Sequence, residues 1–482
     1  MAGIGFELRK IYSEESVGRS VLGAMYSTLV TVGPTIIVVG TILLMYLVLE
    51  YSNVGYQQRE LLSSTILYVF IFAVILTAPF NAIFSRYLAD KIYCEQPKDI
   101  LPSFFSGIAI LSVLGTLIAA PIMVSLYFKG GVDLYYIFAS YLLWMEEIFL
   151  LFGMTYLYAT KDYKVIALSF IFGMASALGI SFLFHYVVGI ETTRSILYGL
   201  TLGTFFAACL NGAYITYFFR DHSNNYSECL SYIKKFFPIF MANLLYFGGL
   251  YVHNFVFWTT QGRIVVAQTY VSMQPYDMAT CLALFTNIST IIIFTVMAET
   301  KFHVKFQSYT AALNGGTLKR IKKEKESMFF LLMKQISLIF GLQIIITILF
   351  YLVIKIFAPD FGFGGMTLEI YPSLAVAYLV IFLMYGNMVY LFYFNDNVGA
   401  FFTGLIFFVC GGAGAWFSKD LPVSYYGLGI LVGSIIGWTY TFFRIRYMEK
   451  HFEEHIFCKQ KIVEVRQVAK KSNDIIYSKP QR

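Results

Sequence analysis

The sequence is poor in charged residues, and this scarcity excludes the soluble class of proteins. Charged side chains make up 13% of the 482 residues, and hydrophobic ones make up 58%. A soluble domain carries about 25% charged and about 45–50% apolar residues. A chain of this length cannot hide so much apolar surface from water, so the excess must face lipid. We therefore predict an all-α integral membrane protein that crosses the bilayer many times.

Cysteine is also scarce, and the patterns of catalytic sites are missing. The six cysteines show no C-x-x-C spacing, which argues against a zinc site or a redox dithiol. His451 and His455 lie four residues apart, but no glutamate follows the first as H-E-x-x-H requires. The glycine-rich run 362–365 precedes no phosphate-binding helix, and no Walker motif is present. We expect no enzyme activity, no cofactor and no metal.

Long apolar runs take the place of these motifs. A spanning helix needs about 20 mostly apolar residues. Reading the runs and the charges that interrupt them predicts about twelve spans. Their approximate limits are 21–49, 61–84, 100–128, 133–158, 164–188, 195–219, 236–258, 275–299, 335–357, 368–393, 397–417 and 423–443.

The distribution of basic residues sets the orientation of these spans. With the N-terminus inside, 29 of the 35 lysines and arginines fall on the inner side. The six on the outer side are Arg59, Lys129, Arg194, Arg263, Lys355 and Lys419. This bias predicts that both termini lie inside, and it assigns the net charge of +7 to topology rather than to nucleic-acid binding. The basic run 319–325 lies in the longest inner loop, where we interpret it as a helix held near anionic lipid.

The chain is predicted to consist of two six-helix halves. Tyr156-Leu157-Tyr158 precedes Asp162 in the same way as Tyr390-Leu391-Phe392 precedes Asp396, which suggests an internal repeat. The predicted parts are an N-terminal bundle at 1–220, a cytoplasmic linker at 221–235, a C-terminal bundle at 236–443 and a basic cytoplasmic tail at 444–482. Transporters with such repeats carry their substrate near the midplane between the halves.

The beginning of the sequence resembles a known family. The stretch Met1-Ala2-Gly3-Ile4-Gly5-Phe6-Glu7-Leu8-Arg9-Lys10, followed by Val32-Gly33-Pro34 in the first span, is similar to the start of PelG proteins. These are membrane proteins of bacterial Pel exopolysaccharide systems. The chain length and the twelve-span plan also fit that family.

The resemblance implies several properties that the residues alone do not give. It implies the fold of the MATE-like exporters, which belong to the multidrug/oligosaccharidyl-lipid/polysaccharide superfamily. It implies export of an amino-sugar-rich polysaccharide across the bacterial cytoplasmic membrane. It also implies partners, namely a cytoplasmic glycosyltransferase and other membrane subunits of a Pel-type complex. It brings no catalytic residues with it.

Polar residues at bilayer depth are the candidates for the transport path, because an ionised side chain there costs at least about 2.5–3.5 kcal/mol. Glu146 and Glu147 lie at the centre of the fourth span and point about 100° apart. They predict either a proton- or cation-sensitive site or an acidic lining for an amine-bearing polymer. The plain alternative is an interhelical hydrogen bond that only fastens the spans.

Two further pairs are candidates. His253 and Asn254, in the outer third of the seventh span, could accept a proton or bond a sugar hydroxyl, or they could simply be packed. Gly33 and Pro34 predict a kink in the first span, either static or used during alternating access. Asp277 and Glu299 lie near the ends of the eighth span, where water is close, and are weaker candidates.

The sequence thus favours a polysaccharide exporter that works by alternating access, or as a conduit beside a glycosyltransferase. Within transport, the alternatives are a cation-coupled MATE-like antiporter and a lipid-linked oligosaccharide flippase. An alternative from another class is a membrane scaffold for the polymer synthase that conducts nothing.

Overall fold

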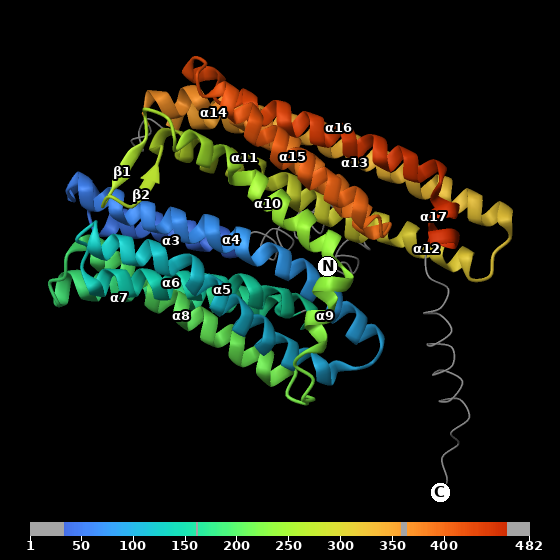
Figure 1. Ribbon diagram of the computed structural model, residues 1–482, viewed down its shortest axis with the longest axis horizontal. Coiled ribbons are helices and arrows are strands. Elements are labelled where there is room, and N and C mark those ends of the chain that lie inside the picture. The colour runs from blue at the N-terminus through green and yellow to red at the C-terminus, as the bar shows by residue number, and fades with distance from the viewer. Residues whose placement is uncertain (1–32, 161, 358–363, 460–482) are drawn as a thin grey trace, which may run out of the picture.

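The computed structural model describes residues 33–160, 162–357 and 364–459. The first half of the chain forms a bundle of long helices with short connections (Figure 1). Its elements are α3 (Gly33–Val48), η1 (Tyr51–Asn53), α4 (Tyr56–Tyr93), η2 (Pro97–Asp99), α5 (Ile100–Phe128), α6 (Leu134–Thr160), α7 (Tyr163–Phe182), η3 (Leu183–Val187) and α8 (Thr192–Phe218).

A short helix leads into the second half, which adds a small hairpin to its long helices. The elements are α9 (Glu228–Lys235), α10 (Phe237–Phe257), β1 (Ile264–Val266), β2 (Tyr270–Ser272), α11 (Gln274–Met297), η4 (Ala298–Phe302), α12 (His303–Leu313), α13 (Leu318–Phe357), α14 (Gly365–Tyr393), α15 (Asn397–Ser418), η6 (Val423–Tyr425), α16 (Leu428–Lys450) and α17 (Phe452–Lys459). The strands β1 and β2 pair antiparallel, with Val265 opposite Val271.

The helices confirm the predicted all-α membrane architecture. Within the described residues, eleven helices are long and apolar enough to cross a bilayer. The shorter α3 supplies the described part of the predicted first span, whose residues 21–32 lie outside the described part of the chain. Helices form here because lipid offers no hydrogen bonds, so each backbone group must be satisfied within its own segment.

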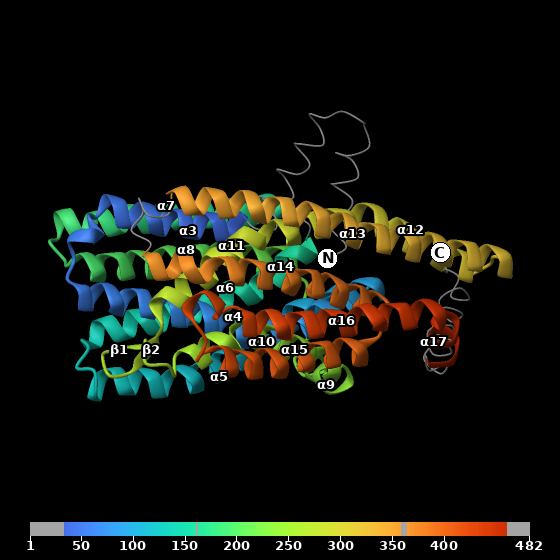
Figure 2. The same ribbon diagram turned by 90° about the horizontal axis from the view of Figure 1, so that it is seen from above.

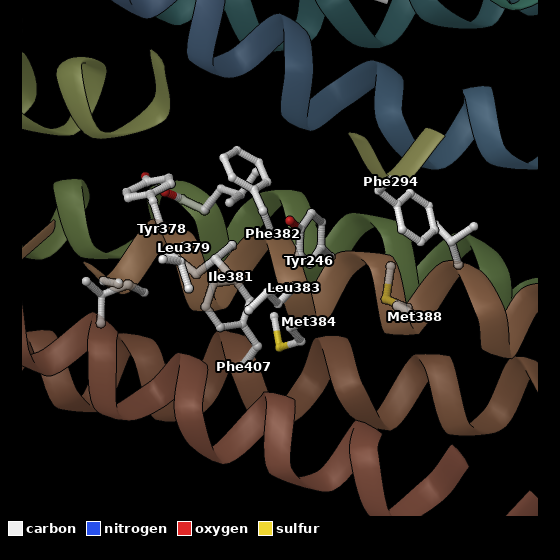
Figure 3. Close-up of a cluster of buried hydrophobic side chains, with 14 of the residues drawn as sticks. Tyr246, Phe294, Tyr378, Leu379, Ile381, Phe382, Leu383, Met384, Met388 and Phe407 are labelled. Atoms are coloured by element: carbon white, nitrogen blue, oxygen red, sulfur yellow. The ribbon is translucent and has the colours of Figure 1, made fainter. Parts of the chain in front are cut away.

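One helix lies at the centre of each half. The apolar stretch of α14 is 83% buried by its neighbours, whereas that of α13 is only 17% buried. Figure 3 shows α14 side chains from Tyr378 to Met388 packed around Tyr246 of α10, Phe294 of α11 and Phe407 of α15. In the first half, α6 is the most buried helix, at 61%. The lipid-facing position of α13 follows from its low burial.

Helices at corresponding positions of the two halves pack in the same arrangement. In the first half α7 packs on α8, and α4, α5 and α8 surround α6; in the second half α15 packs on α16, and α11, α13 and α16 surround α14. Small residues permit the close crossings. A Cβ atom built on Gly203 would lie 2.5 Å from the carbonyl oxygen of Gly173, and one on Gly429 would lie 2.2 Å from that of Gly414.

The halves have largely separate hydrophobic cores. One cluster of buried side chains runs from Met45 to Ile239, and the other contains Ala242 to Phe452 together with Ile71 of α4. Helix α10 also packs along α4, so these two helices form the main junction between the halves. Helix α4 contributes buried residues to both clusters, and the predicted domain limits remain a prediction.

Three predicted features fall partly or wholly outside the described residues. The opening stretch 1–10 and Val32 lie outside them, and so does the tail after residue 459. Gly33 and Pro34 are buried at the very start of the described helix α3. Because the residues before Gly33 are not described, the kink stays a prediction.

Candidate transport site

Glu146 is held between two helices of the first half. Its side chain is buried on α6, and its Oε2 accepts a hydrogen bond of 2.6 Å from the hydroxyl of Thr204 on α8. The same hydroxyl lies within hydrogen-bonding distance of the Leu200 and Thr201 carbonyl oxygens of its own helix. The sequence predicted a partner or cavity for this carboxylate, and Thr204 is a partner. Such a bond across helices fits the fastening interpretation for Glu146.

Glu147 differs from its neighbour. It is only partly buried, and its carboxylate makes no hydrogen bond or ion pair with any residue in the described ranges. On the α4 side of α6, Asn81 donates a hydrogen bond of 3.2 Å to the Leu151 carbonyl, while its own Oδ1 is buried without a partner among these residues. Unpaired polar atoms at this depth are costly in lipid. Of the two glutamates, Glu147 is therefore the one without a partner in the described residues, and its role in a transport path stays a prediction.

His253 lies in a fully buried polar cluster of the second half. Its Nδ1 is 2.8 Å from the Tyr276 hydroxyl on α11, and its Nε2 is 3.1 Å from the Tyr378 hydroxyl on α14. Tyr378 donates its proton to the Leu250 carbonyl at 2.9 Å. The imidazole thus joins the three helices α10, α11 and α14. These bonds satisfy both ring nitrogens without a ligand.

Asn254 connects this cluster to Asp277, which is itself buried. The Asn254 Nδ2 donates to the Asp277 Oδ1 at 2.7 Å, and the Trp258 indole nitrogen donates to both carboxylate oxygens at 3.0 and 3.1 Å. The backbone nitrogen of Met273 also donates to Oδ2 at 3.0 Å. The expectation that Asp277 lies beside water was wrong, because these donors pack around its carboxylate and leave the residue 6% exposed.

The structure therefore brings His253, Asn254 and Asp277 into one polar region and leaves the two glutamates in the other half. The first three lie on α10 and α11 and the glutamates on α6, and no bond joins the two groups within the described residues. Sequence reasoning missed Thr204, Trp258, Tyr276 and Tyr378 as partners. Thr204 and Tyr378 lie 58 and 125 residues from Glu146 and His253, and Trp258 and Tyr276 lie 19 and 23 residues from Asp277 and His253, so no pattern within one span indicates these contacts. The side chain of Glu299 is not among those described.

The hairpin β1–β2 closes the junction between the halves at one end of the bundle (Figure 1). The Tyr68 hydroxyl on α4 donates to the Val271 carbonyl and accepts from the Val271 nitrogen, both at 2.9 Å. The hydroxyls of Ser125 and Thr269 are 2.8 Å apart, and Gln274 donates to Glu60 at 3.0 Å. The basic-residue distribution predicts this end to be the outer one. The hairpin therefore joins the second half to α4 and α5 of the first.

A cavity of about 610 Å³ also lies at this end, within the first half, between the loops that follow α3 and η3. Glu50 receives a hydrogen bond from Asn53 at 2.8 Å, and Gln58 donates to Glu191. These bonds keep the carboxylates paired with amides of the same half.

Comparison with known proteins identifies the family. The model of the PelG family, described as "Putative exopolysaccharide Exporter (EPS-E)", matches residues 1–457. The chain belongs to the PelG family. A search of curated proteins gave no match.

Solved structures show the fold of this PelG-family chain. An outward-facing multidrug resistance MATE family transporter of the MOP superfamily superposes with a TM-score of 0.58 at 14% identity, covering 89% of this chain and 96% of that one. An inward-facing structure of such a transporter gives 0.53 at 14% identity, covering 88% and 96%. A MOP superfamily transporter from Pyrococcus furiosus, described as having a binding pocket of reverse polarity, gives a TM-score of 0.57 at 14% identity, covering 89% and 96%.

These matches confirm the predicted family and the MATE-like fold. Identities of 13–15% establish the fold alone and carry no binding residues over. Family and fold together support a multi-pass membrane transporter. The choice of Glu146, Glu147, His253 and Asn254 as pathway residues stays a prediction.

Proposed function

We propose that this PelG-family chain exports an amino-sugar-rich, Pel-type exopolysaccharide across the bacterial cytoplasmic membrane, beside a cytoplasmic glycosyltransferase and other membrane subunits. The observation that carries the proposal is the family match over residues 1–457. The MATE-like fold, with α4 and α10 at the junction of two helical bundles, supports a path between the halves.

The geometry supports a path that is closed at its predicted outer end. Tyr68, Ser125 and Glu60 of the first half are hydrogen-bonded to the hairpin and to the start of α11. Glu147 lies deeper, on α6, with no partner among the described residues. In alternating access the hairpin contacts break when the outer end opens, and Glu147 then faces the moving polymer. An amine on that polymer pairs with the carboxylate better than water does at this depth.

A cation-coupled antiporter is the second candidate, and the cluster around Asp277 favours it. A buried carboxylate held by three nitrogen donors is a group whose charge state affects the packing of α10 against α11. The MATE-like fold is shared with multidrug transporters. In this alternative the second half carries the coupling ion, and the substrate is a small molecule.

Deleting the protein in its host distinguishes these functions. We expect secreted polymer to disappear while sugar-nucleotide consumption or intracellular polymer shows that synthesis continues. Unchanged secretion with new sensitivity to cationic dyes would favour the antiporter. Accumulation of a lipid-linked oligosaccharide on the inner leaflet would favour the flippase, and loss of synthesis itself would favour the scaffold.

A further inference from the structure

Trp258 connects the two halves at the end of the bundle where β1–β2 lies, which we call the hairpin end (Figures 1 and 2). It caps the C-terminus of α10 and is 7% exposed. Its ring lies parallel to that of Tyr68 on α4, with the centroids 5.1 Å apart and an angle of 8° between the planes. Its indole nitrogen donates to both oxygens of Asp277. One side chain thus contacts the first half with its face and the second half with its edge.

Asp277 fixes the orientation of this ring. Tryptophan has a single hydrogen-bond donor, whose N–H lies in the plane of the ring. The two Asp277 oxygens lie 3.0 and 3.1 Å from that nitrogen, so the ring keeps its edge toward the carboxylate. Asn254 and the Met273 nitrogen hold the carboxylate in turn, at 2.7 and 3.0 Å. The bonds that orient Trp258 therefore lie wholly within the second half.

A second pair of stacked rings continues the contact along the junction. Phe72, one turn after Tyr68 on α4, stacks on Phe255 of α10, with the centroids 5.7 Å apart and an angle of 18° between the planes. The Phe255 ring also meets the Trp258 ring edge to face at 5.1 Å. Stacked and edge-to-face ring pairs are favourable beyond the area that they bury. Trp258 therefore contacts both of these stacks between α4 and α10.

The ring contacts differ in kind from the hydrogen bonds of the hairpin. Ser125 and Thr269 are half-buried, and water can replace the bond between their hydroxyls when the halves separate. Water cannot replace a stack of apolar faces, because separating Trp258 from Tyr68 exposes hydrophobic surface. We therefore expect the stack to contribute more to closure than a hydrogen bond of the hairpin does.

We propose that Trp258 is a positioning residue that holds the two halves closed at the hairpin end, and that Asp277 acts through it by setting its orientation. The inference rests on the proposed function, because a transporter that opens at this end needs a contact that breaks and re-forms. When the stack opens, Trp258 keeps its bonds to Asp277 and stays oriented with the second half. Tyr68 then meets a ring that is already in place, so closure requires little ordering of side chains.

The test measures the distance between the halves by double electron–electron resonance in the full-length protein, reconstituted in nanodiscs. With the native cysteines replaced by alanine, nitroxide labels are placed at two exposed positions, Gln57→Cys on α4 and Asp420→Cys after α15. We expect Trp258→Ala to raise the population at longer distances about tenfold. The matched control is Trp438→Ala on α16, which removes an equally large ring that packs on Phe442 of its own helix. It should leave the distances unchanged.

A double-mutant cycle tests the role of Asp277. Trp258→Phe keeps a ring face but loses the N–H, and Asp277→Ala removes the acceptor. Each should raise the longer-distance population by less than Trp258→Ala does, and the two together should have the effect of one, because both remove the same contact. Trp258→Phe also decides the matter if Asp277→Ala does not fold, since wild-type distances in it would show that the N–H contributes nothing.

The remaining outcomes overturn the inference or the function on which it rests. If Trp258→Ala lowers the midpoint of thermal unfolding but leaves the distances unchanged, Trp258 only packs. Fully additive effects in the double variant would show that Asp277 does not act through Trp258. If secretion needs the protein but the distances ignore Trp258, only this inference fails. If the deletion strain secretes polymer normally, the proposed function fails, whatever the distances show.

Discussion

At the scale of single residues, the two adjacent carboxylates of α6 have unequal surroundings. Glu146 is buried and accepts a hydrogen bond from Thr204, whereas Glu147 is partly exposed and has no partner among the described residues. A bond between helices stabilises the bundle by a modest amount, about 0.6 kcal/mol on average in membranes. An unpartnered carboxylate at bilayer depth carries a cost that no contact in the described chain offsets, which is the reason we predict a role in transport for Glu147.

We predict that Glu147→Gln lowers polymer secretion about tenfold, equivalent to about 1.4 kcal/mol, with an unchanged amount of protein in the membrane. The amide removes the charge while keeping the shape, and no hydrogen bond within the described residues is lost. Secreted polymer per unit of immunoblotted protein is the measurement. Glu146→Gln is the matched comparison, since its amide oxygen still accepts from Thr204, and it should secrete more than Glu147→Gln does. Normal secretion by Glu147→Gln at a normal level would remove this residue from the mechanism.

We predict that Asp277→Asn destabilises the protein by about 1–2 kcal/mol. Trp258 and the Met273 nitrogen both donate to Asp277, and an asparagine NH₂ would confront one of these donors with another donor. The midpoint of thermal unfolding in detergent is the measurement. Asp420→Asn, at an exposed position after α15, is the control and should leave the midpoint unchanged. An unshifted midpoint in Asp277→Asn would mean that the cluster does not hold α10 against α11.

At the scale of elements, the crossing of α15 over α16 depends on the absence of side chains. Gly414 and Gly429 meet backbone to backbone, and the Cβ of an alanine at 429 would lie 2.2 Å from the Gly414 oxygen. We predict that Gly429→Ala pushes these two helices apart and lowers the free energy of unfolding by about 1–3 kcal/mol. The yield of monodisperse protein and its unfolding midpoint are the measurements.

Gly341→Ala is the control for this crossing. Gly341 lies on the exposed side of α13 with nothing within 4 Å of an added Cβ atom. Alanine favours a helix more than glycine does, by about 1 kcal/mol, so this variant should be as stable as wild type or more so. Equal losses in the two variants would show that helix propensity or lipid contact, and not the crossing, explains the result.

At the scale of the whole molecule, the hairpin contacts predict a switch between two states. We expect Ser125→Cys combined with Thr269→Cys to form a disulfide across the halves, because the native hydroxyls are 2.8 Å apart and the predicted outer face is oxidising. A transporter locked in this way should stop secreting polymer, and a reducing agent should restore secretion. Each single cysteine variant is a control. Normal secretion by the fully oxidised double variant would favour the scaffold, which needs no such motion.

The long helices could be predicted from sequence because lipid imposes a local rule. Each apolar run must satisfy its own backbone, so the limits of α5 and α6 fall within two residues of those expected. Asp277 shows where this local rule fails. Its position near the end of a span suggested water, but Asn254 and Trp258, which lie outside that span, donate to the carboxylate and the residue is buried. The basic run 319–325 was expected in a loop before the ninth span, whereas α13 runs unbroken through both from Leu318 to Phe357.

The sequence by itself determined that this protein is helical, crosses a membrane many times and resembles PelG proteins. These conclusions follow from composition, the length of apolar runs and the opening motif, all of which are local properties of the chain. Only the tertiary structure decided which polar groups are paired. Thr204 forms a hydrogen bond with Glu146, and Tyr276 and Tyr378 form hydrogen bonds with His253. Glu147 has no partner in the described chain. The reason is that these partners lie on other helices, 23 to 125 residues away in sequence, whose rotation about their axes is set by packing.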